Sequence, residues 1–277
     1  GLSPVDALYS QQWGFTGTHG MRVPGAWDRT TGSGATVAVI DTGITSHPDL
    51  DRNVVPGYDF ISDGRAARDG GGRDSNPRDE GDWYAAGECG TAGASDYSWH
   101  GTHVAGTVAA VADSRGVVGV APNAKIQPIR VLGKCGGSLS DIADAVVWAA
   151  GGTVAGVPAN PNPADVINMS LGSADGVDSA DQGEALAIAN AQHAGVQVIV
   201  AAGNEGLSTS AQGNEVDALG LLDNGALGSP AAAPAAWSVA SINNVHKVVT
   251  AAKATWEGGS AEVGYQQQAG PADFETH

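Results

Sequence analysis

The chain has 277 residues, enough for a single large hydrophobic core, and its longest apolar runs are far too short to cross a bilayer. A total of 13 basic against 30 acidic residues gives a net charge of -17, which argues against nucleic acids and anionic membranes as partners. The composition therefore predicts a soluble protein, and its charge suits a secreted protein that holds cations.

The N-terminal segment GLSPVDALYS has neither the basic start nor the apolar centre of a signal peptide. We therefore expect a secreted chain that has been processed from a precursor. Short apolar, β-branched runs further along predict buried strands. They are ATVAVI at 35–40, IQPIRVL at 126–132, DVINMSL at 165–171 and VQVIVAA at 196–202.

Two helices are predicted between these strands. In SLSDIADAVVWAA, residues 138–150, apolar side chains recur at helical spacing, and Ser138 or Ser140 is available as the N-cap. An alanine-rich helix over 179–194 ends at Gly195. Strands that alternate with helices imply right-handed crossovers and a doubly wound α/β fold, a parallel sheet with helices on both faces.

Two regions interrupt this pattern. Residues 59–99 are rich in Gly, Asp and Arg, and the composition of residues 207–229 predicts a polar, glycine-rich loop. No long linker divides the chain, so we expect one domain over residues 1–243. Residues 244–277 fit no part of the pattern and are expected to be a tail or the start of an insertion.

Three polar side chains are expected at the carboxyl edge of the sheet, where ligands bind in such folds. Asp41 follows the first strand, His100 opens the helical segment HGTHVAG, and Asn204 follows the last strand. Each has a structural alternative, as a turn aspartate, a helix-capping histidine and a turn-forming asparagine. Together they are the parts of an acyl-transfer site: a carboxylate that orients an imidazole, an imidazole that removes a hydroxyl proton, and an amide that donates to an oxyanion.

The pair His100 and His103 does not predict a zinc site. Zinc-binding helices of the protease type place two histidines at i and i+4 with a glutamate between them. Here the spacing is i, i+3 and no acid lies between the two histidines.

Five segments resemble the signature segments of the subtilisin-like serine proteases, the subtilase family, in the same order. They are VAVIDTGITSHPDL, HGTHVAGTVA, GVVGVAPNAKIQPIRVL, DVINMSLG and VIVAAGNEG, within roughly residues 10–242. The likeness is greatest to secreted bacterial members with a long loop between the Asp and His segments. It implies a subtilisin-like fold in which Asp41 is the orienting carboxylate, His100 the general base and acid, and Asn204 the oxyanion donor.

The resemblance also implies that an extended peptide substrate lies against exposed backbone. The implied walls of its groove and primary pocket are Gly136, Gly137, Ser170, Leu171, Gly172, Ala202 and Gly203. These residues are small or apolar and carry no charge. We therefore expect a preference for large apolar or aromatic side chains before the scissile bond.

The two cysteines, Cys89 and Cys135, lie beside glycines and not in a CxxC pair. They are either unrelated thiols or a disulfide, and the features that point outside the cell favour the disulfide. Closing a loop of this length stabilises a chain by about 4 kcal/mol in the chain-entropy model.

The resemblance implies a structural calcium site made of hard oxygen donors. The implied ligands are the side chains of Asp49 and Asp113, the carbonyls of Val111, Arg115 and Val117, and Gln11. A second calcium site is expected within residues 63–83, from Asp69, Asp74, Asp79 and Asp82. The alternative for this segment is a solvated loop, because four arginines balance much of its acid.

The segment that carries the nucleophilic serine in this family, GTSMA or a near variant, is absent from the sequence. Ser260 in GGSAEVG lacks both the preceding threonine and the following apolar helix, and no G-x-S-x-G elbow occurs. Three explanations stay open: one piece of a longer protease, a tail that begins an inserted domain, or a pseudoenzyme. We expect the C-terminal part of the domain, with its serine, to lie outside this chain.

The expected function is therefore that of a secreted serine endopeptidase, of which this fragment alone is inactive. Its expected partners are protein or peptide substrates, a propeptide or protein inhibitor, and its own C-terminal segment as a separate chain. No organic cofactor is expected. The alternative is a noncatalytic, calcium-stabilised pseudoprotease that binds peptides in the same groove.

Overall fold

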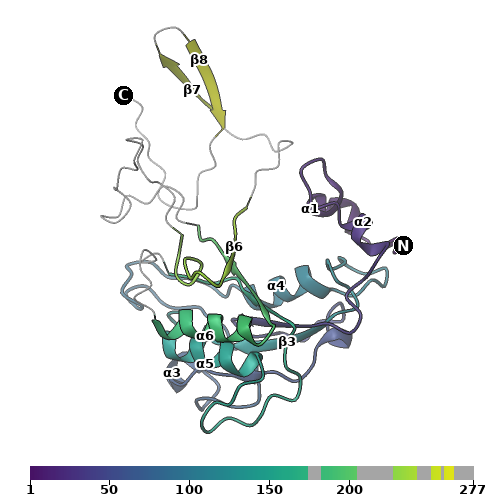
Figure 1. Ribbon diagram of the computed structural model, residues 1–277. Coiled ribbons are helices and arrows are strands. Elements are labelled where there is room, and N and C mark those ends of the chain that lie inside the picture. The colour runs from purple at the N-terminus through teal and green to yellow at the C-terminus, as the bar shows by residue number, and fades with distance from the viewer. Residues whose placement is uncertain (174–181, 205–226, 242–250, 257–258, 265–277) are drawn as a thin grey trace. The chain divides into compact units, whose positions relative to one another are not determined.

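A computed structural model describes residues 1–173, 182–204, 227–241, 251–256 and 259–264 (Figure 1). The chain divides into two compact units, Gly1–Ala240 and Ser241–His277. In the part of the chain that the structure describes, none of the helices has the length and apolar character that a membrane span requires.

The described residues of the first unit form a six-stranded sheet in the order β2-β3-β1-β4-β5-β6. Its strands are β1 (Thr36–Asp41), β2 (Tyr58–Asp59), β3 (Lys125–Arg130), β4 (Val166–Met169), β5 (Gln197–Ala201) and β6 (Trp237–Val239). All neighbouring strands run parallel. The predicted α/β fold with a parallel sheet is confirmed, and so are the four strands expected from apolar runs.

Three longer helices connect these strands: α4 (His100–Ala109), α5 (Leu139–Ala149) and α6 (Gln182–His193). Ser138 is the N-cap of α5, because its hydroxyl accepts a hydrogen bond from the N–H of Asp141 at 3.2 Å. The start at residue 179 that was predicted for α6 lies outside the described residues. The shorter elements are η1 (Tyr9–Gln11), α1 (Trp13–Thr16), α2 (Val23–Trp27), η2 (Asp51–Asn53) and α3 (Gly64–Ala67).

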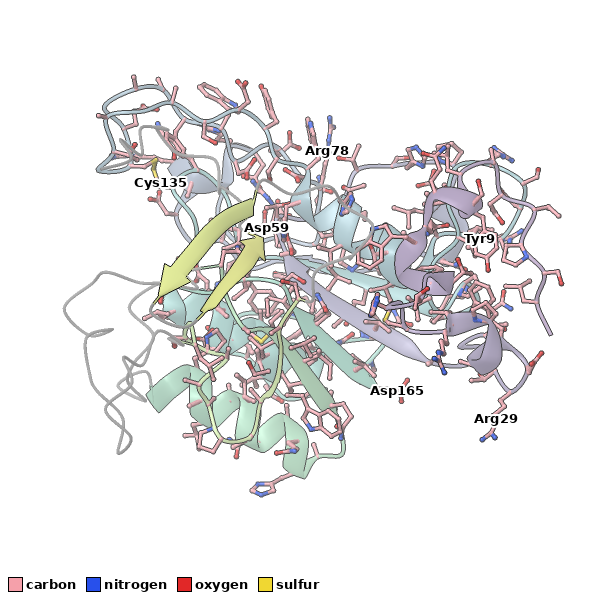
Figure 2. All side chains as sticks on the ribbon, turned by 90° about the horizontal axis from the view of Figure 1, so that it is seen from above. Tyr9, Arg29, Asp59, Arg78, Cys135 and Asp165 are labelled. Atoms are coloured by element: carbon pink, nitrogen blue, oxygen red, sulfur yellow. A yellow bond between two sulfur atoms is a disulfide. The ribbon has the colours of Figure 1, made fainter. Side chains whose placement is uncertain are left out.

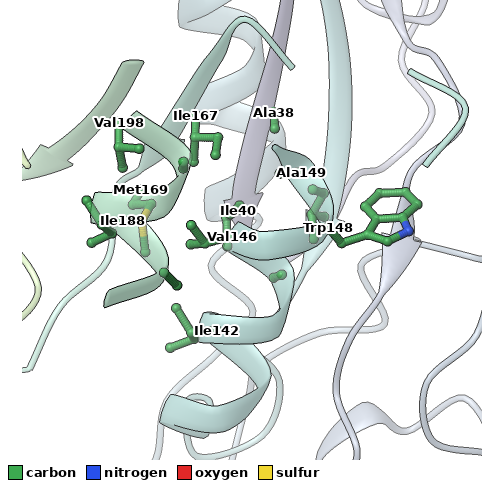
Figure 3. Packing of buried hydrophobic residues seen from close by; sticks show 14 of the residues in the cluster. Ala38, Ile40, Ile142, Val146, Trp148, Ala149, Ile167, Met169, Ile188 and Val198 are labelled. Atoms are coloured by element: carbon green, nitrogen blue, oxygen red, sulfur yellow. The ribbon is translucent and has the colours of Figure 1, made fainter. Parts of the chain in front are cut away.

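Side chains that alternate along β1 divide the core between the two faces of the sheet. Ala38 and Ile40 belong to the cluster that packs against α5 and α6, with Val146 among its central members (Figure 3). Val37 and Val39 point to the other face, where the cluster contains residues of α4 such as Ala105 and Ala109. Helices therefore lie on both faces, as the doubly wound pattern predicts.

The second unit contains an antiparallel hairpin of β7 (Ala251–Trp256) and β8 (Gly259–Gly264). The sequence does not predict these strands, because both segments are rich in Gly, Ala and charged residues, which have low β propensity. The remaining residues of the predicted tail lie outside the described residues, and the domain boundary at residue 243 stays a prediction.

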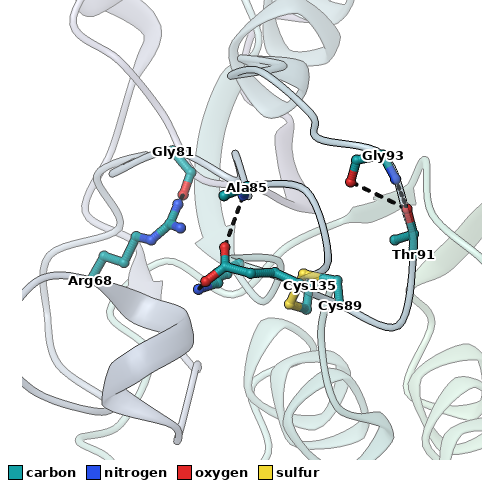
Figure 4. Close-up of a disulfide and its surroundings, with 9 residues drawn as sticks. Arg68, Gly81, Ala85, Cys89, Thr91, Gly93 and Cys135 are labelled. Atoms are coloured by element: carbon teal, nitrogen blue, oxygen red, sulfur yellow. Dashed lines mark hydrogen bonds and ion pairs between the residues drawn. A yellow bond between two sulfur atoms is a disulfide. The ribbon is translucent and has the colours of Figure 1, made fainter.

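The predicted disulfide is confirmed between Cys89 and Cys135, whose Cα atoms are 5.1 Å apart (Figure 4). It joins the long segment 59–99 to the loop that follows β3. An ion pair between Lys134 and Glu88 lies beside it. The same segment is also held near its start, where Asp59 lies in the interior of the fold (Figure 2) and accepts a hydrogen bond from the buried Arg130 at 2.7 Å.

Candidate active site

Asp41 and His100 meet at the carboxyl edge of the sheet. Asp41 is the last residue of β1 and is fully buried, whereas His100 is the first residue of α4 and its side chain is 46% exposed. Nδ1 of His100 lies 2.8 Å from Oδ1 and 2.9 Å from Oδ2 of the carboxylate. The structure thus brings together the two residues that the sequence analysis singled out first.

The contact with Asp41 determines which ring nitrogen of His100 is available. An ionised carboxylate accepts hydrogen bonds only, so Nδ1 carries the proton and Nε2 keeps its lone pair. The hydrogen bond to Asp41 raises the pKa of His100 above its ordinary value, more than burial lowers it, and the charge of Asp82 adds to the rise. The imidazole is therefore a stronger base than a free histidine.

Asn204 occupies the exposed stretch that follows β5. In the sheet order, β4 lies between β1 and β5, so the ends of these two strands are about 10 Å apart at the usual strand spacing. The oxyanion role of Asn204 stays a prediction.

One cavity of about 350 Å³ contains parts of both predicted substrate walls. Gly136 and Gly137 line it together with Leu171 and Gly172. Its other lining residues are Leu132, Cys135, Leu139, Ile142, Ser173, Glu184 and Ser229. The carboxylate of Glu184 was not expected here, because the sequence analysis foresaw walls without charge.

The other predicted wall residues do not line this cavity. Ser170 accepts a hydrogen bond from the amide of Asn168 at 2.9 Å. The backbone of Ala202 pairs with Val239 and Gly228, and Gly203 follows it with a φ of 112°. Their part in substrate binding therefore stays a prediction.

A group of carboxylates lies beside α4, formed by Asp6, Asp49 and Asp113, whose ligand oxygens are all within 4.8 Å of one another. Oδ2 of Asp6 and Oδ1 of Asp49 are buried and have no hydrogen-bond partner. Burial raises the pKa of Asp49, and the charges of Asp113 and Asp6 raise it further. Hard, unpaired oxygens that repel one another fit a cation such as calcium.

This group contains the predicted Asp49 and Asp113, but Asp6 was missed. Gln11 lines a cavity together with Asp49 and Val117, and Val111 donates its N–H to the carbonyl of Asp49 at 2.8 Å. Arg115 donates its N–H to Asp113 at 3.1 Å. These contacts place the predicted carbonyl donors near the carboxylates, and their role as ligands stays a prediction.

The four carboxylates of the predicted second calcium site do not meet. Asp69, Asp74 and Asp79 each accept a hydrogen bond from the N–H two residues further along. Asp82 instead accepts from the N–H and the hydroxyl of Ser98, at 2.8 and 2.6 Å. Among the described residues, the group of three acidic side chains close enough to share a cation includes none of them, and the second calcium site stays a prediction. Local turns use one carboxylate oxygen each of Asp69, Asp74 and Asp79.

The sequence matches the subtilase family over residues 32–274. The chain belongs to the subtilase family. It is 60% identical over 212 residues to an extracellular protease of Xanthomonas campestris pv. campestris, which is 76% of this chain and 36% of the relative. An extracellular basic protease of Dichelobacter nodosus is 49% identical over 217 residues, which is 75% of this chain and 35% of that protein.

Subtilisin Savinase of Lederbergia lenta is 37% identical over 199 residues, which is 71% of this chain and 57% of that subtilisin. Among solved structures, a protease from Pseudoalteromonas arctica PAMC 21717 superposes with a TM-score of 0.71 and 56% identity, over 74% of this chain and 60% of that one. The predicted family and subtilisin-like fold class are thus confirmed. The subtilase chain spans about a third of the length of the first two relatives.

Proposed function

We propose that the complete protein is a secreted serine endopeptidase in which Asp41 and His100 activate a serine supplied by sequence outside this chain. The observation that carries the proposal is the hydrogen bond between the buried carboxylate and Nδ1 of His100 at the edge of a parallel sheet. It leaves Nε2 able to accept a proton. Family membership and the likeness to extracellular proteases support the same function.

In the proposed reaction the serine oxygen attacks the carbonyl carbon of the scissile bond while its proton moves to Nε2 of His100. Asp41 stabilises the imidazolium that forms, and the amide of Asn204 donates to the oxyanion. The proton on Nε2 then passes to the departing amine, which leaves an acyl ester on the serine. Water hydrolyses this ester through the same two proton transfers.

The substrate is proposed to be an extended polypeptide whose side chains enter the cavity between Gly136 and Leu171. Apolar residues such as Leu132 and Ile142 line much of this cavity and favour large apolar side chains. The remaining partners are a propeptide or protein inhibitor that occupies the same groove, and a C-terminal segment of the protein itself.

Calcium is proposed to bind between Asp6, Asp49 and Asp113. When bound, it neutralises carboxylates that otherwise repel one another, and its role is structural. The N-terminal residues and the loop that follows α4 meet here, since Leu8 donates its N–H to the carbonyl of Gly116 at 2.8 Å. The cation would therefore hold these two segments together.

Labelling with a fluorophosphonate tests the proposed function. The complete native protein should gain one adduct on a serine beyond residue 277, and His100→Ala should abolish the labelling. His103→Ala is the matched control, because His103 lies exposed on the same helix and should not affect the adduct. Labelling that survives in His100→Ala would contradict the proposed role of the histidine.

A noncatalytic peptide-binding protein is the second candidate. In the described part of the chain, no serine or threonine hydroxyl is hydrogen-bonded to the His100 ring, so this part alone lacks the third member of a triad. Homogeneous, folded protein that gains no adduct but binds peptides in a fluorescence anisotropy assay would support this function and exclude the first.

A further inference from the structure

Thr42, the residue after Asp41, connects three parts of the molecule through hydrogen bonds. Its N–H donates to Oδ1 of Asp41 at 2.7 Å, and its hydroxyl oxygen accepts from the N–H of Gly101, in the first turn of α4, at 2.9 Å. The same hydroxyl donates to Oδ2 of Asp79 at 2.7 Å. Because a hydroxyl has one proton, the bond to Asp79 turns the oxygen lone pairs toward Gly101.

Asp79 is a buried carboxylate with both oxygens in use. It is 3% exposed, and its Oδ1 accepts a hydrogen bond from the N–H of Gly81 at 2.8 Å. Burial raises its pKa, and the hydrogen bonds from Thr42 and Gly81 oppose this rise; the charge of Asp82 adds to it and that of Arg130 opposes it. Burying a carboxylate is costly, so a side chain placed here for packing alone would be apolar.

The first turn of α4 has little freedom to shift. A Cβ atom on Gly101 would lie 2.4 Å from the carbonyl oxygen of Gly43, so the helix already touches the chain that follows β1. The N–H of His100 donates to the hydroxyl of Ser98 at 3.2 Å, and Ser98 in turn donates to Asp82. Two carboxylates of segment 59–99 therefore hold successive residues of this turn.

We propose that Asp79 is a positioning residue for the Asp41–His100 pair. It acts through the Thr42 hydroxyl to hold the first turn of α4 against the end of β1. The inference rests on the proposed function, because alignment of the pair matters for catalysis only if His100 transfers a proton. Its test does not require hydrolysis.

The titration of His100, followed by NMR in the 277-residue chain, reports the alignment directly. Asp79→Asn should lower the pKa of His100 toward its ordinary value, because an amide accepts from one of the two donors but not from both. Thr42→Val, which removes the hydroxyl and keeps the shape, should have the same effect. The double variant should shift the pKa no further than either single one, since both changes break one chain of contacts.

Two controls isolate this effect. Asp74→Asn removes a charge from the same segment. Among the described residues, the side chain of Asp74 accepts only from the N–H of Asn76, so His100 should titrate as in the wild type. Thr42→Ser keeps the hydroxyl and should also leave the titration unchanged. The charged groups that act on the His100 ring, Asp41 and Asp82, are retained in every variant.

In the complete protein, Asp79→Asn should lower kcat by about tenfold to hundredfold with KM unchanged, the scale expected for a small misplacement of a reacting group. An unchanged His100 titration in Asp79→Asn, or additive shifts in the double variant, would overturn the inference. If Asp79→Asn does not fold, identical titrations of His100 in Thr42→Val and Thr42→Ser would overturn the inference instead. If the complete protein hydrolyses no peptide, the proposed function is refuted, but the titration still tests whether Asp79 positions His100.

Discussion

Replacing Asp6 by asparagine tests the carboxylate group, because the expected effect changes sign with calcium. In saturating calcium the variant loses a charged ligand and should melt below the wild type. Calcium at 100 times its dissociation constant adds about 2.7 kcal/mol to the free energy of unfolding. At about 2–4 °C per kcal/mol for a chain of this size, its removal should lower the wild-type melting temperature by roughly 5–11 °C.

In EDTA the order of the two proteins should reverse. Asp6→Asn then removes one of the like charges that raise the pKa of Asp49. The new amide can also donate to a buried carboxylate oxygen of Asp49 that lacks a partner. The pKa of Asp49 is raised in the folded state, so the protonated carboxyl group stabilises the fold at a pH below its ordinary pKa. This stabilisation is lost as the pH rises through the raised pKa. The stabilising effect of Asp6→Asn should therefore grow as the pH rises above the ordinary pKa of Asp49.

Thermal unfolding followed by intrinsic fluorescence, in calcium and in EDTA, measures both effects. Asp96→Asn is the matched control: Asp96 is exposed, and the same change of charge there should leave both melting temperatures near those of the wild type. A wild-type melting temperature that EDTA does not move, with Asp6→Asn shifting stability in the same direction in both buffers, would refute the calcium site.

Three further outcomes are expected. Arg130→Met should lower the free energy of unfolding in urea by about 3–5 kcal/mol at pH 7, because it leaves the buried carboxylate of Asp59 without its partner. Burial raises the pKa of Asp59 to about 6, so a smaller decrease at pH 5, where Asp59 can be protonated, would support this cause. Replacing both cysteines by alanine should lower the free energy of unfolding by about 2–5 kcal/mol, and reductant should destabilise the wild type but not the variant. In NMR titrations, Asp41→Asn should lower the pKa of His100, and an unshifted titration would show that Asp41 does not act on the imidazole. The hydrolytic rate of the complete wild-type protein should rise with pH through a pKa above 6.5.

The Asp41–His100 pair was predictable because it depends on the sheet. A carboxylate directly after a buried apolar strand must lie at the carboxyl edge of a parallel sheet, and the helix that opens with His100 returns to the same edge. Asp6 was not predictable in this way. It reaches Asp49 only because the N-terminal segment packs on the loop that follows α4, and no local pattern in the sequence records that contact.

At the predicted second calcium site, three of the four carboxylates take part in local turns. Aspartates spaced by glycine-rich turns have the composition of a cation-binding loop, but the same spacing suits turns in which the side chain binds the N–H two residues further along. Asp69 and Asp74 do this on the exposed part of the loop, and Asp79 does it in the interior. Sequence alone does not distinguish the two uses, because both need a carboxylate followed by residues that permit a tight turn.

Segment 59–99 is attached at several points to the parts of the molecule that surround the site. The buried pair of Asp59 and Arg130 holds its start under the sheet edge. The disulfide holds the middle of the segment beside Gly136, in the predicted substrate wall. Cys89, Gly136 and Asp82 line a cavity of about 300 Å³ here. Asp79 reaches the pair through Thr42, and Asp82 reaches it through Ser98, whose hydroxyl accepts from the N–H of His100. Thr42 also lines this cavity, so the segment that borders the predicted substrate wall is the one that contacts the residue after Asp41.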